Sequence, residues 1–220
     1  MLMQFPILKH KSLVPAIVVM AIAGITGLVI SLQLLPGWPM IGLVLLLLLT
    51  TIYALFASDF TPMLLRFGVM VYAVTTALMV VAQRNPALMG EFSFGTALGP
   101  FFNNVGLLLG LPWFVLIICS FPIAQRLSEN IYLRALFGAL LFIVPATFMM
   151  YNAETLNFFY WENVFPPVQA FLVWFAVAFF LHFAGVQLQV KSEHPAALAL
   201  YITWFAFNVL LFVLRFLLKN

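Results

Sequence analysis

Apolar residues follow one another in long runs along this chain, and polar residues are confined to short stretches between the runs. A helix needs about 20 apolar residues to cross the hydrocarbon core of a membrane. Runs of about that length predict seven membrane-spanning helices. Their expected ranges are Leu13–Leu35, Trp38–Phe56, Leu64–Ala82, Val105–Phe121, Tyr132–Tyr151, Val168–Phe183 and Ala197–Leu218.

Helices are the expected form of these spans because backbone groups in lipid must find their hydrogen-bond partners within the segment. No ten-residue alternating pattern indicates the strands of a barrel. The "PGWP" stretch at 36–39 predicts a tight turn between the first two spans. The sequence therefore predicts an all-α integral membrane protein, a bundle of about seven transmembrane helices that forms a single domain over residues 1–220.

Composition supports a membrane protein and excludes several kinds of site. Hydrophobic residues make up 65% of the chain and charged residues 7%, against about 25% charged residues in a soluble domain. The first apolar run is too long for the core of a signal peptide, so we expect it to remain as a helix. The small net charge of +3 indicates no nucleic-acid partner. The three histidines lie far apart, so we expect no metal site and no cofactor, and Cys119 is expected to be a small core residue.

Basic residues near the ends of the spans predict the orientation. With seven spans the two termini lie on opposite sides, and cytoplasmic loops carry an excess of Lys and Arg. The amino-terminal side would hold Lys9, Lys11, Arg66, Arg126, Arg134 and Lys191, and the other side Arg84, Arg215 and Lys219. The sequence thus predicts a cytoplasmic amino terminus in a bacterial-type inner membrane, with the carboxyl terminus on the opposite side.

The clearest ionisable residue inside a predicted span is His182, in "FFLHFAG" near the end of the sixth span. Ionisable groups are costly in lipid and are candidates for function. Phe175, Phe179 and His182 are spaced i, i+4 and i+7, which places them on one helix face. His182 is therefore a candidate proton carrier or ligand anchor. The alternative is an interfacial histidine that is hydrogen-bonded to a neighbouring carbonyl.

Two stripes of mildly polar residues also follow helical spacing. One, on the third span, contains Tyr72, Thr76, Met79 and Gln83. The other, on the fifth span after a proline at 145 that is expected to kink the helix, contains Thr147, Tyr151 and Glu154. The stripes would face one another if both lined a ligand site inside the bundle. Ordinary interhelical hydrogen bonds are the alternative.

Most of the unusual residues are expected at one rim of the bundle. The stretch "NPALMGEFSFGTALGPFF" follows the third span, "NFFYWENVFPP" follows the fifth, and both fall on the same side. They place Glu91, Glu154 and Glu162 among aromatic residues. Desolvation raises the pKa of a carboxyl group and leaves it a proton to donate, so these three are candidate general acids. An ordinary aromatic belt is the alternative explanation of the rings.

The same two stretches carry a family resemblance. "MGEFSFGTALGP" followed by "GLLLGLPWFVL" resembles the membrane carotenoid biosynthesis proteins of the carotenoid 1,2-hydratase (bisanhydrobacterioruberin hydratase) type, which have a Gly-x-Tyr-x-Tyr loop, a Leu-Gly-Pro and a helix with a tryptophan. "NFFYWENVFPPVQAFLVWF" is similar to a second block of that family. The resemblance covers about residues 65–185. The matching positions are Gly90, Phe92, Phe94, Leu98, Gly99, Pro100, Trp113, Trp161, Glu162, Pro167 and Trp174.

The resemblance implies a protein that acts on or binds a long polyene, with Glu91, Glu154, Glu162 and His182 as catalytic candidates. The expected ligand-binding residues are Tyr72, Thr76, Met79, Phe92, Phe94, Trp113, Tyr151, Trp161 and Trp174. The chain also departs from the family. Phenylalanine replaces both loop tyrosines. The positions where the family has acidic residues are Met79, Ala146 and Met150 in this chain, and the position of the family's asparagine is Ala170. Hydration protonates an alkene carbon and adds a placed water, which calls for a buried acid.

Three functions remain open from the sequence. An enzyme, a lyase that adds water to a terminal carotenoid double bond, requires at least one of the three glutamates to point into the bundle near His182 or Tyr72. A non-catalytic protein that binds a carotenoid or membrane lipid, as a subunit of a larger membrane complex, requires an apolar groove and glutamates that face water. A transporter is disfavoured because the spans contain no paired charges and the chain has no inverted repeat.

Overall fold

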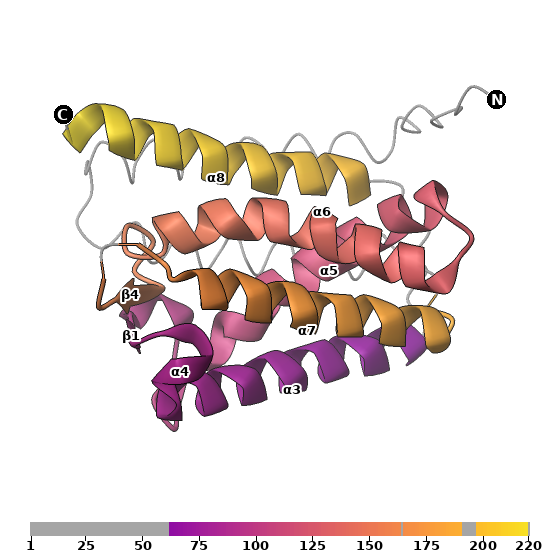
Figure 1. Ribbon diagram of the computed structural model, residues 1–220, viewed down its shortest axis with the longest axis horizontal. Helices are drawn as coiled ribbons and strands as arrows, with labels where there is room; N and C mark the ends of the chain where they lie inside the picture. The colour runs from indigo at the N-terminus through magenta and orange to yellow at the C-terminus, as the bar shows by residue number, and fades with distance from the viewer. Residues whose placement is uncertain (1–61, 164, 191–196, 220) are drawn as a thin grey trace.

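Five long helices form the part of the chain that the structure, a computed structural model, describes: residues 62–163, 165–190 and 197–219. Four of them lie roughly side by side in Figure 1, with α5 behind. Each contains a stretch long and apolar enough to cross a membrane. Their bounds are α3 Pro62–Arg84, α5 Gly110–Leu127, α6 Ile131–Asn152, α7 Val168–Gln187 and α8 Ala197–Lys219.

The last five predicted spans are therefore confirmed as helices. The first two predicted spans, at 13–35 and 38–56, and the turn between them lie outside the described residues. The fourth span differs most clearly: it was expected to end at Phe121, whereas α5 ends at Leu127, and to begin at Val105, whereas α5 begins at Gly110. The intervening residues form a short strand, β3 (Val105–Gly106), and a 3-10 turn, η2 (Leu107–Leu109).

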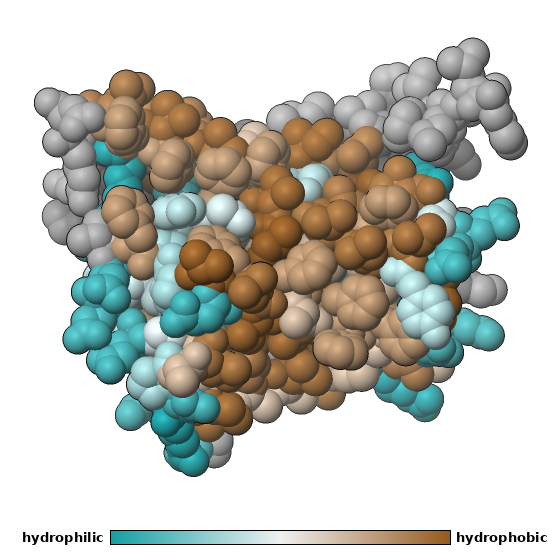
Figure 2. Space-filling model, viewed as in Figure 1, coloured by the Kyte–Doolittle hydropathy of each residue, from teal (hydrophilic) through white to brown (hydrophobic). Residues whose placement is uncertain are grey.

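The surface has the pattern of a membrane-spanning bundle. Figure 2 shows hydrophobic residues across the middle of one face and hydrophilic residues gathered at its two ends. Large apolar side chains such as Val69, Leu172 and Phe180 are more than 60% exposed on the helices. Such exposure is unfavourable in water and ordinary in lipid. The described helices thus form an all-helical membrane-spanning bundle.

The rim that follows α3 and α6 is not helical throughout, which the sequence did not predict. It contains the short helix α4 (Pro86–Met89), the 3-10 turn η1 (Thr96–Leu98) and three further strands: β1 (Phe92–Phe94), β2 (Phe101–Phe102) and β4 (Phe159–Trp161). Strand β2 pairs with β3, and β1 pairs antiparallel with β4. The β1–β4 pair joins the two loops at one end of the bundle (Figure 1).

The strands form because the rim backbone lies outside the helices and still needs hydrogen-bond partners. Both β1 and β4 are rich in aromatic residues, which favour strands, and Phe92 lies opposite Trp161 in the register. Bonds beyond the pair extend the junction: the amide of Gly95 donates to the carbonyl of Phe158 at 2.8 Å, and the amide of Ala97 to that of Asn157 at 3.0 Å.

Helix α5 is the centre of the bundle and contacts α3, α6, α7 and α8. Most of its side chains are buried. Near its amino-terminal end Trp113 packs against Phe142 of α6 and Trp174 of α7, with ring centroids 4.4 and 5.0 Å apart. All three rings are fully buried, so this aromatic cluster is where three helices are held together.

Polar contacts join α6 to α8. Pro145 has no amide hydrogen, so the carbonyl of Leu141, four residues earlier in α6, loses its helical partner. The hydroxyl of Tyr201 on α8 donates to this carbonyl at 2.7 Å. At the rim, Arg215 donates to the carbonyl of Tyr151 and to the carboxylate of Glu154, each at 2.6 Å.

Candidate functional site

The three candidate acids all lie at the rim and are exposed to solvent. Glu91 and Glu162 flank the β1–β4 pair, and the amide of Glu162 donates to the carbonyl of Glu91 at 3.0 Å. The hydrogen bond that protonated Glu162 donates to the Glu91 carboxylate, together with the charge of that carboxylate, raises the pKa of Glu162 above its ordinary value. Glu154 instead pairs with Arg215, and 57% of its side chain is exposed.

The expectation that a glutamate points into the bundle near His182 or Tyr72 is therefore not met. Glu91 and Glu162 lie next to each other in water rather than in a desolvated pocket, and Glu154 is paired with an arginine. The loops are joined edge to edge by strand pairing, which leaves their charged side chains at the outer surface. Burial keeps a carboxyl group protonated at neutral pH, so that it has a proton to donate, and these exposed side chains lack it.

Glycines of the loop that follows α3 permit close backbone approach between the two rim loops. A Cβ added at Gly95 would lie 2.2 Å from the backbone oxygen of Asn157. Gly90 has a φ of +85° and lies against the ring of Pro167. Asn157 adds side-chain hydrogen bonds to the contact between the two rim loops. Its side-chain oxygen accepts from the amide of Thr96 at 3.2 Å and from the hydroxyl of Tyr160 at 2.7 Å.

The expected ligand-binding rings of the rim and the core form one continuous aromatic column. Each contacts the next at ring-centroid distances between 5.0 and 6.3 Å. The column runs from the rim into the bundle through Phe94, Phe92, Trp161, Phe159, Trp174 and Trp113. Because Trp113 and Trp174 are fully buried against each other, the column has exposed surface only at its rim end.

His182 lies in the core where α5, α6 and α7 meet, with 1% of its surface exposed. Its Nδ1 donates to the carbonyl of Ala178 at 2.7 Å, because a carbonyl oxygen only accepts. In the neutral ring Nε2 then accepts from the hydroxyl of Ser120 at 2.8 Å. The ring stacks on Phe121 and leaves no space for a side chain at Gly138, whose Cβ would lie 2.1 Å from it.

This arrangement departs from both sequence interpretations of His182. The histidine is bonded to a carbonyl, as the alternative proposed, but it is buried rather than interfacial. The buried stripe of α7 contains Trp174, Ala178 and His182, whereas Phe175 and Phe179 are only partly buried beside it. His182 thus serves as a hydrogen-bonded junction between α7 and α5.

The two polar stripes do not face one another. The buried face of α3 is centred on Val71, Thr75 and Met79, so Tyr72 and Thr76 lie at its edge. The hydroxyl of Tyr72 donates to the carbonyl of Leu107 at 2.8 Å. The hydroxyl of Thr76 is buried and has no hydrogen-bond partner among the described residues.

On α6 the second stripe faces other elements. Tyr151 is ringed by Phe165, Phe171 and Phe212, at centroid distances of 5.7 to 6.1 Å. Thr147 bonds the carbonyl of Ile143 in its own helix at 2.8 Å. The stripe therefore lies toward α7 and α8, and the hypothesis of a shared interior site between the two stripes is wrong.

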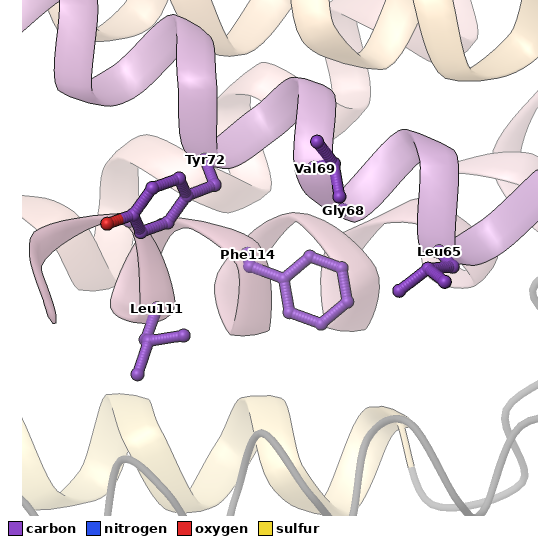
Figure 3. A pocket seen from close by; sticks show the side chains of 7 residues that line it. Leu65, Gly68, Val69, Tyr72, Leu111 and Phe114 are labelled. Atoms are coloured by element: carbon purple, nitrogen blue, oxygen red, sulfur yellow. The ribbon is translucent and has the colours of Figure 1, made fainter. Parts of the chain in front are cut away.

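An apolar groove lies between α3 and α5, with a volume of about 190 Å³. Its lining residues are Leu65, Gly68, Val69, Tyr72, Gly110, Leu111 and Phe114. Figure 3 shows the rings of Tyr72 and Phe114 next to each other, with Leu65 and Leu111 at the two sides. Both flanking helices are long and apolar enough to span a membrane, so the groove opens at membrane depth.

Each helix places a ring on a glycine of the other to form this groove. A Cβ at Gly68 of α3 would lie 2.8 Å from the ring of Phe114 on α5. A Cβ at Gly110 of α5 would lie 2.3 Å from the ring of Tyr72 on α3. Tyr72 was predicted from the sequence as a ligand-binding residue, whereas the two glycines were not, because their significance depends on which ring lies opposite.

Other residues of the site were also missed. Ser120 is an isolated hydroxyl in an apolar run, a signal that could have paired it with His182. Arg215 was counted only as a charge, although it fixes Glu154. The described residues contain no group of three or more His, Cys, Asp or Glu side chains that could hold a metal ion.

Comparisons with known proteins add no relative, since no family model, no curated protein and no solved structure matches the chain. The interpretation of the site therefore depends on its own geometry and on the resemblance of its motifs.

Proposed function

We propose that this protein binds a long apolar molecule, a carotenoid-like polyene or another membrane lipid, without reacting with it. The observation that carries the proposal is the apolar groove between α3 and α5 at membrane depth. Its lining residues include no titratable group other than Tyr72, whose hydroxyl is already bonded to the carbonyl of Leu107. A groove of this composition provides apolar contact area for a ligand and contains no carboxyl group that could protonate it.

The size of the groove limits what it holds. A cavity of about 150 Å³ lined by apolar side chains accepts a molecule such as benzene. A groove of about 190 Å³ therefore holds one ring or a short segment of a chain, and the remainder of a long molecule would lie along the lipid-facing helices. The resemblance of the two rim motifs supports a polyene as the class of molecule.

The test is a binding measurement on the full chain in mild detergent, with β-carotene as the probe. We expect binding followed by a shift of the carotenoid absorption bands, and we expect Gly110→Leu, which fills the groove and displaces Tyr72, to weaken it at least tenfold. Gly138→Ala, which disturbs the core junction at His182 away from the groove, is the control for general loss of packing. Equal binding by the unaltered protein and Gly110→Leu would contradict the proposal.

The pair of Glu91 and Glu162 favours a second candidate, the addition of water to a terminal double bond of a polyene. The raised pKa of Glu162 supports a proton donor at the rim, next to the exposed end of the aromatic column. Aromatic faces stabilise a cation. The addition balances when the carboxyl proton goes to one alkene carbon, water oxygen bonds to the other, and the water's proton returns to the carboxylate.

This second candidate predicts a product one water heavier than the polyene supplied. Incubation with lycopene in liposomes, followed by mass analysis, should then give a tertiary alcohol that Glu162→Gln abolishes. Glu154→Gln, at a carboxylate that is paired with Arg215, should leave the yield unchanged. Recovery of lycopene alone would exclude hydration of this substrate and leave the binding proposal standing.

We further propose that the rim faces away from the cytoplasm of a bacterial-type inner membrane and that the amino terminus is cytoplasmic. Arg84 and Arg215 lie at the rim end, whereas Arg66, Arg126 and Arg134 lie at the other ends of α3, α5 and α6. The larger number of arginines supports a cytoplasmic location for that end. As a non-catalytic lipid-binding protein it would act beside other membrane subunits, and co-purification after mild solubilisation tests this.

A further inference from the structure

Three polar atoms are buried between α6 and α8 without a hydrogen-bond partner among the residues that the structure describes. They are the side-chain oxygens of Asn152 and Asn208 and the indole N–H of Trp204. The exposed fractions of these side chains are 0%, 1% and 2%. Buried polar atoms are nearly always paired in native proteins, so each such atom calls for an explanation.

Two hydrogen bonds hold the three residues together. The Asn152 side-chain amide donates to the backbone carbonyl of Asn208 at 2.7 Å, and the Asn208 side-chain amide donates to the carbonyl of Trp204 at 2.9 Å. If the side-chain nitrogen and oxygen of either asparagine were interchanged, its side-chain oxygen would face a backbone carbonyl oxygen and no hydrogen bond could form. The geometry therefore fixes both side-chain oxygens as acceptors.

The cluster lies within the membrane-spanning part of α8. Asn208 is seven residues from Arg215, which binds the end of α6 at the rim, so it lies about 10 Å along the helix from that rim. At this depth no bulk solvent satisfies the three atoms, and an unpaired polar group is most costly in such surroundings.

The chemistry of the three atoms selects a partner. Two acceptors and one donor exclude a cation, which the indole N–H would repel, and an anion, which the two oxygens would repel. A hydroxyl group both donates and accepts. It can donate to an asparagine oxygen and accept from the Trp204 N–H.

We propose that the α6–α8 interface contains a binding site for a hydroxyl group, supplied by water or by an alcohol, with Asn152, Asn208 and Trp204 as its ligands. Water has two O–H bonds and satisfies both oxygens and the indole. Three hydrogen bonds are the usual number for a buried water. An alcohol satisfies one oxygen and the indole. This site is separate from the α3–α5 groove and does not depend on the proposed function.

The first test uses ultraviolet resonance Raman spectroscopy, in which the indole band reports hydrogen bonding of the N–H. The difference between the unaltered protein and Trp204→Phe isolates Trp204. The difference spectrum between the unaltered protein and Trp174→Phe gives the band of a buried indole N–H without a hydrogen bond. Trp174 is a matched reference because its N–H is buried among rings and also lacks a partner among the described residues. We expect a hydrogen-bonded band for Trp204 alone. A non-bonded band for Trp204 would overturn the proposal.

The second test separates the two sources and needs only the unaltered protein. An infrared band of a sequestered O–H that shifts when the protein is purified in H₂¹⁸O assigns water. A band that does not shift, with an alcohol found by mass spectrometry in the organic extract, assigns an alcohol. The absence of any sequestered O–H band together with an extract free of alcohol would overturn the proposal, even if Trp204→Phe failed to fold.

Discussion

At the scale of single residues, the buried polar side chains of this bundle act mainly as contacts between helices. His182 was the obvious candidate for chemistry, because an ionisable residue in a membrane span is costly. Its two nitrogens are both occupied, one by the Ala178 carbonyl of its own helix and one by Ser120 of α5. A histidine with both nitrogens bonded in a packed core stabilises the structure.

The first prediction tests this role. Ser120→Ala leaves Nε2 of His182 without its partner in an apolar core, which should cost about 1–3 kcal/mol of stability. We expect a lower midpoint of thermal unfolding in detergent. Thr75→Val is the control, because the Thr75 hydroxyl is also buried but bonds only carbonyls of its own helix. Equal effects of the two substitutions would argue against an interhelical role.

The second prediction concerns pH and the rim. The pKa of Glu162 is raised by its hydrogen bond to Glu91 and by the charge of that carboxylate. A pKa that is higher in the folded state gives a stabilisation that is present at low pH and lost as pH rises through the folded value. Ionisation of both carboxyl groups should then loosen the adjoining β1–β4 pair.

The fluorescence of Trp161, taken as the difference from Trp161→Phe, measures this loosening. We expect a transition above the ordinary pKa of a glutamate that disappears in Glu162→Gln and weakens in high salt, because both side chains are exposed and screened. Glu154→Gln should keep the transition. A transition that persists in Glu162→Gln would assign it to another group.

At the scale of elements, a proline in one helix is matched by a hydroxyl on another. Pro145 leaves the carbonyl of Leu141 without an amide partner, and Tyr201 supplies the hydrogen bond. The kink-forming proline of α6 is thus tolerated because α8 completes the hydrogen bonding. This coupling explains why the fifth span keeps a proline in its interior.

A double-mutant cycle tests the coupling. Tyr201→Phe should cost about 0.5–2 kcal/mol, the range of single hydrogen bonds in membrane bundles. In a Pro145→Ala background the new amide N–H bonds the Leu141 carbonyl, so Tyr201→Phe should have a much smaller effect. Equal costs in the two backgrounds, measured by thermal unfolding, would show that the two sites are independent.

At the scale of the whole molecule, the pairing of β1 with β4 connects the loop after α3 to the loop after α6, and we call this contact the rim joint. Gly95 makes the joint possible, since its Cβ position lies 2.2 Å from the backbone oxygen of Asn157. Gly95→Ala should push the two loops apart and break the bond from the amide of Gly95 to the carbonyl of Phe158. We expect faster cleavage of the loop at 153–163 in limited proteolysis. Ser93→Ala, at an exposed position of β1, should cleave at the rate of the unaltered protein.

The sequence by itself determined the elements of this bundle and the gathering of unusual residues at one rim. Hydropathy and span length depend on consecutive residues, so the existence and order of the five described helices follow directly, although the ends of α5 do not. On α3, Tyr72 and Thr76 each follow a buried residue, Val71 and Thr75, by one position. Successive helical residues differ by about 100° in direction, so a shift of one position moves a side chain to the edge of the buried face.

Only the tertiary structure decided which side chains meet. Pairing of β1 with β4 turned Glu91 and Glu162 toward water and toward each other. Packing of α5 against α7 gave His182 its partner Ser120, 62 positions away in the chain. The groove arises because rings of α3 and α5 lie on glycines of the opposite helix. These contacts join residues far apart in sequence, and their geometry is set by how whole helices pack, which local patterns of polarity do not encode.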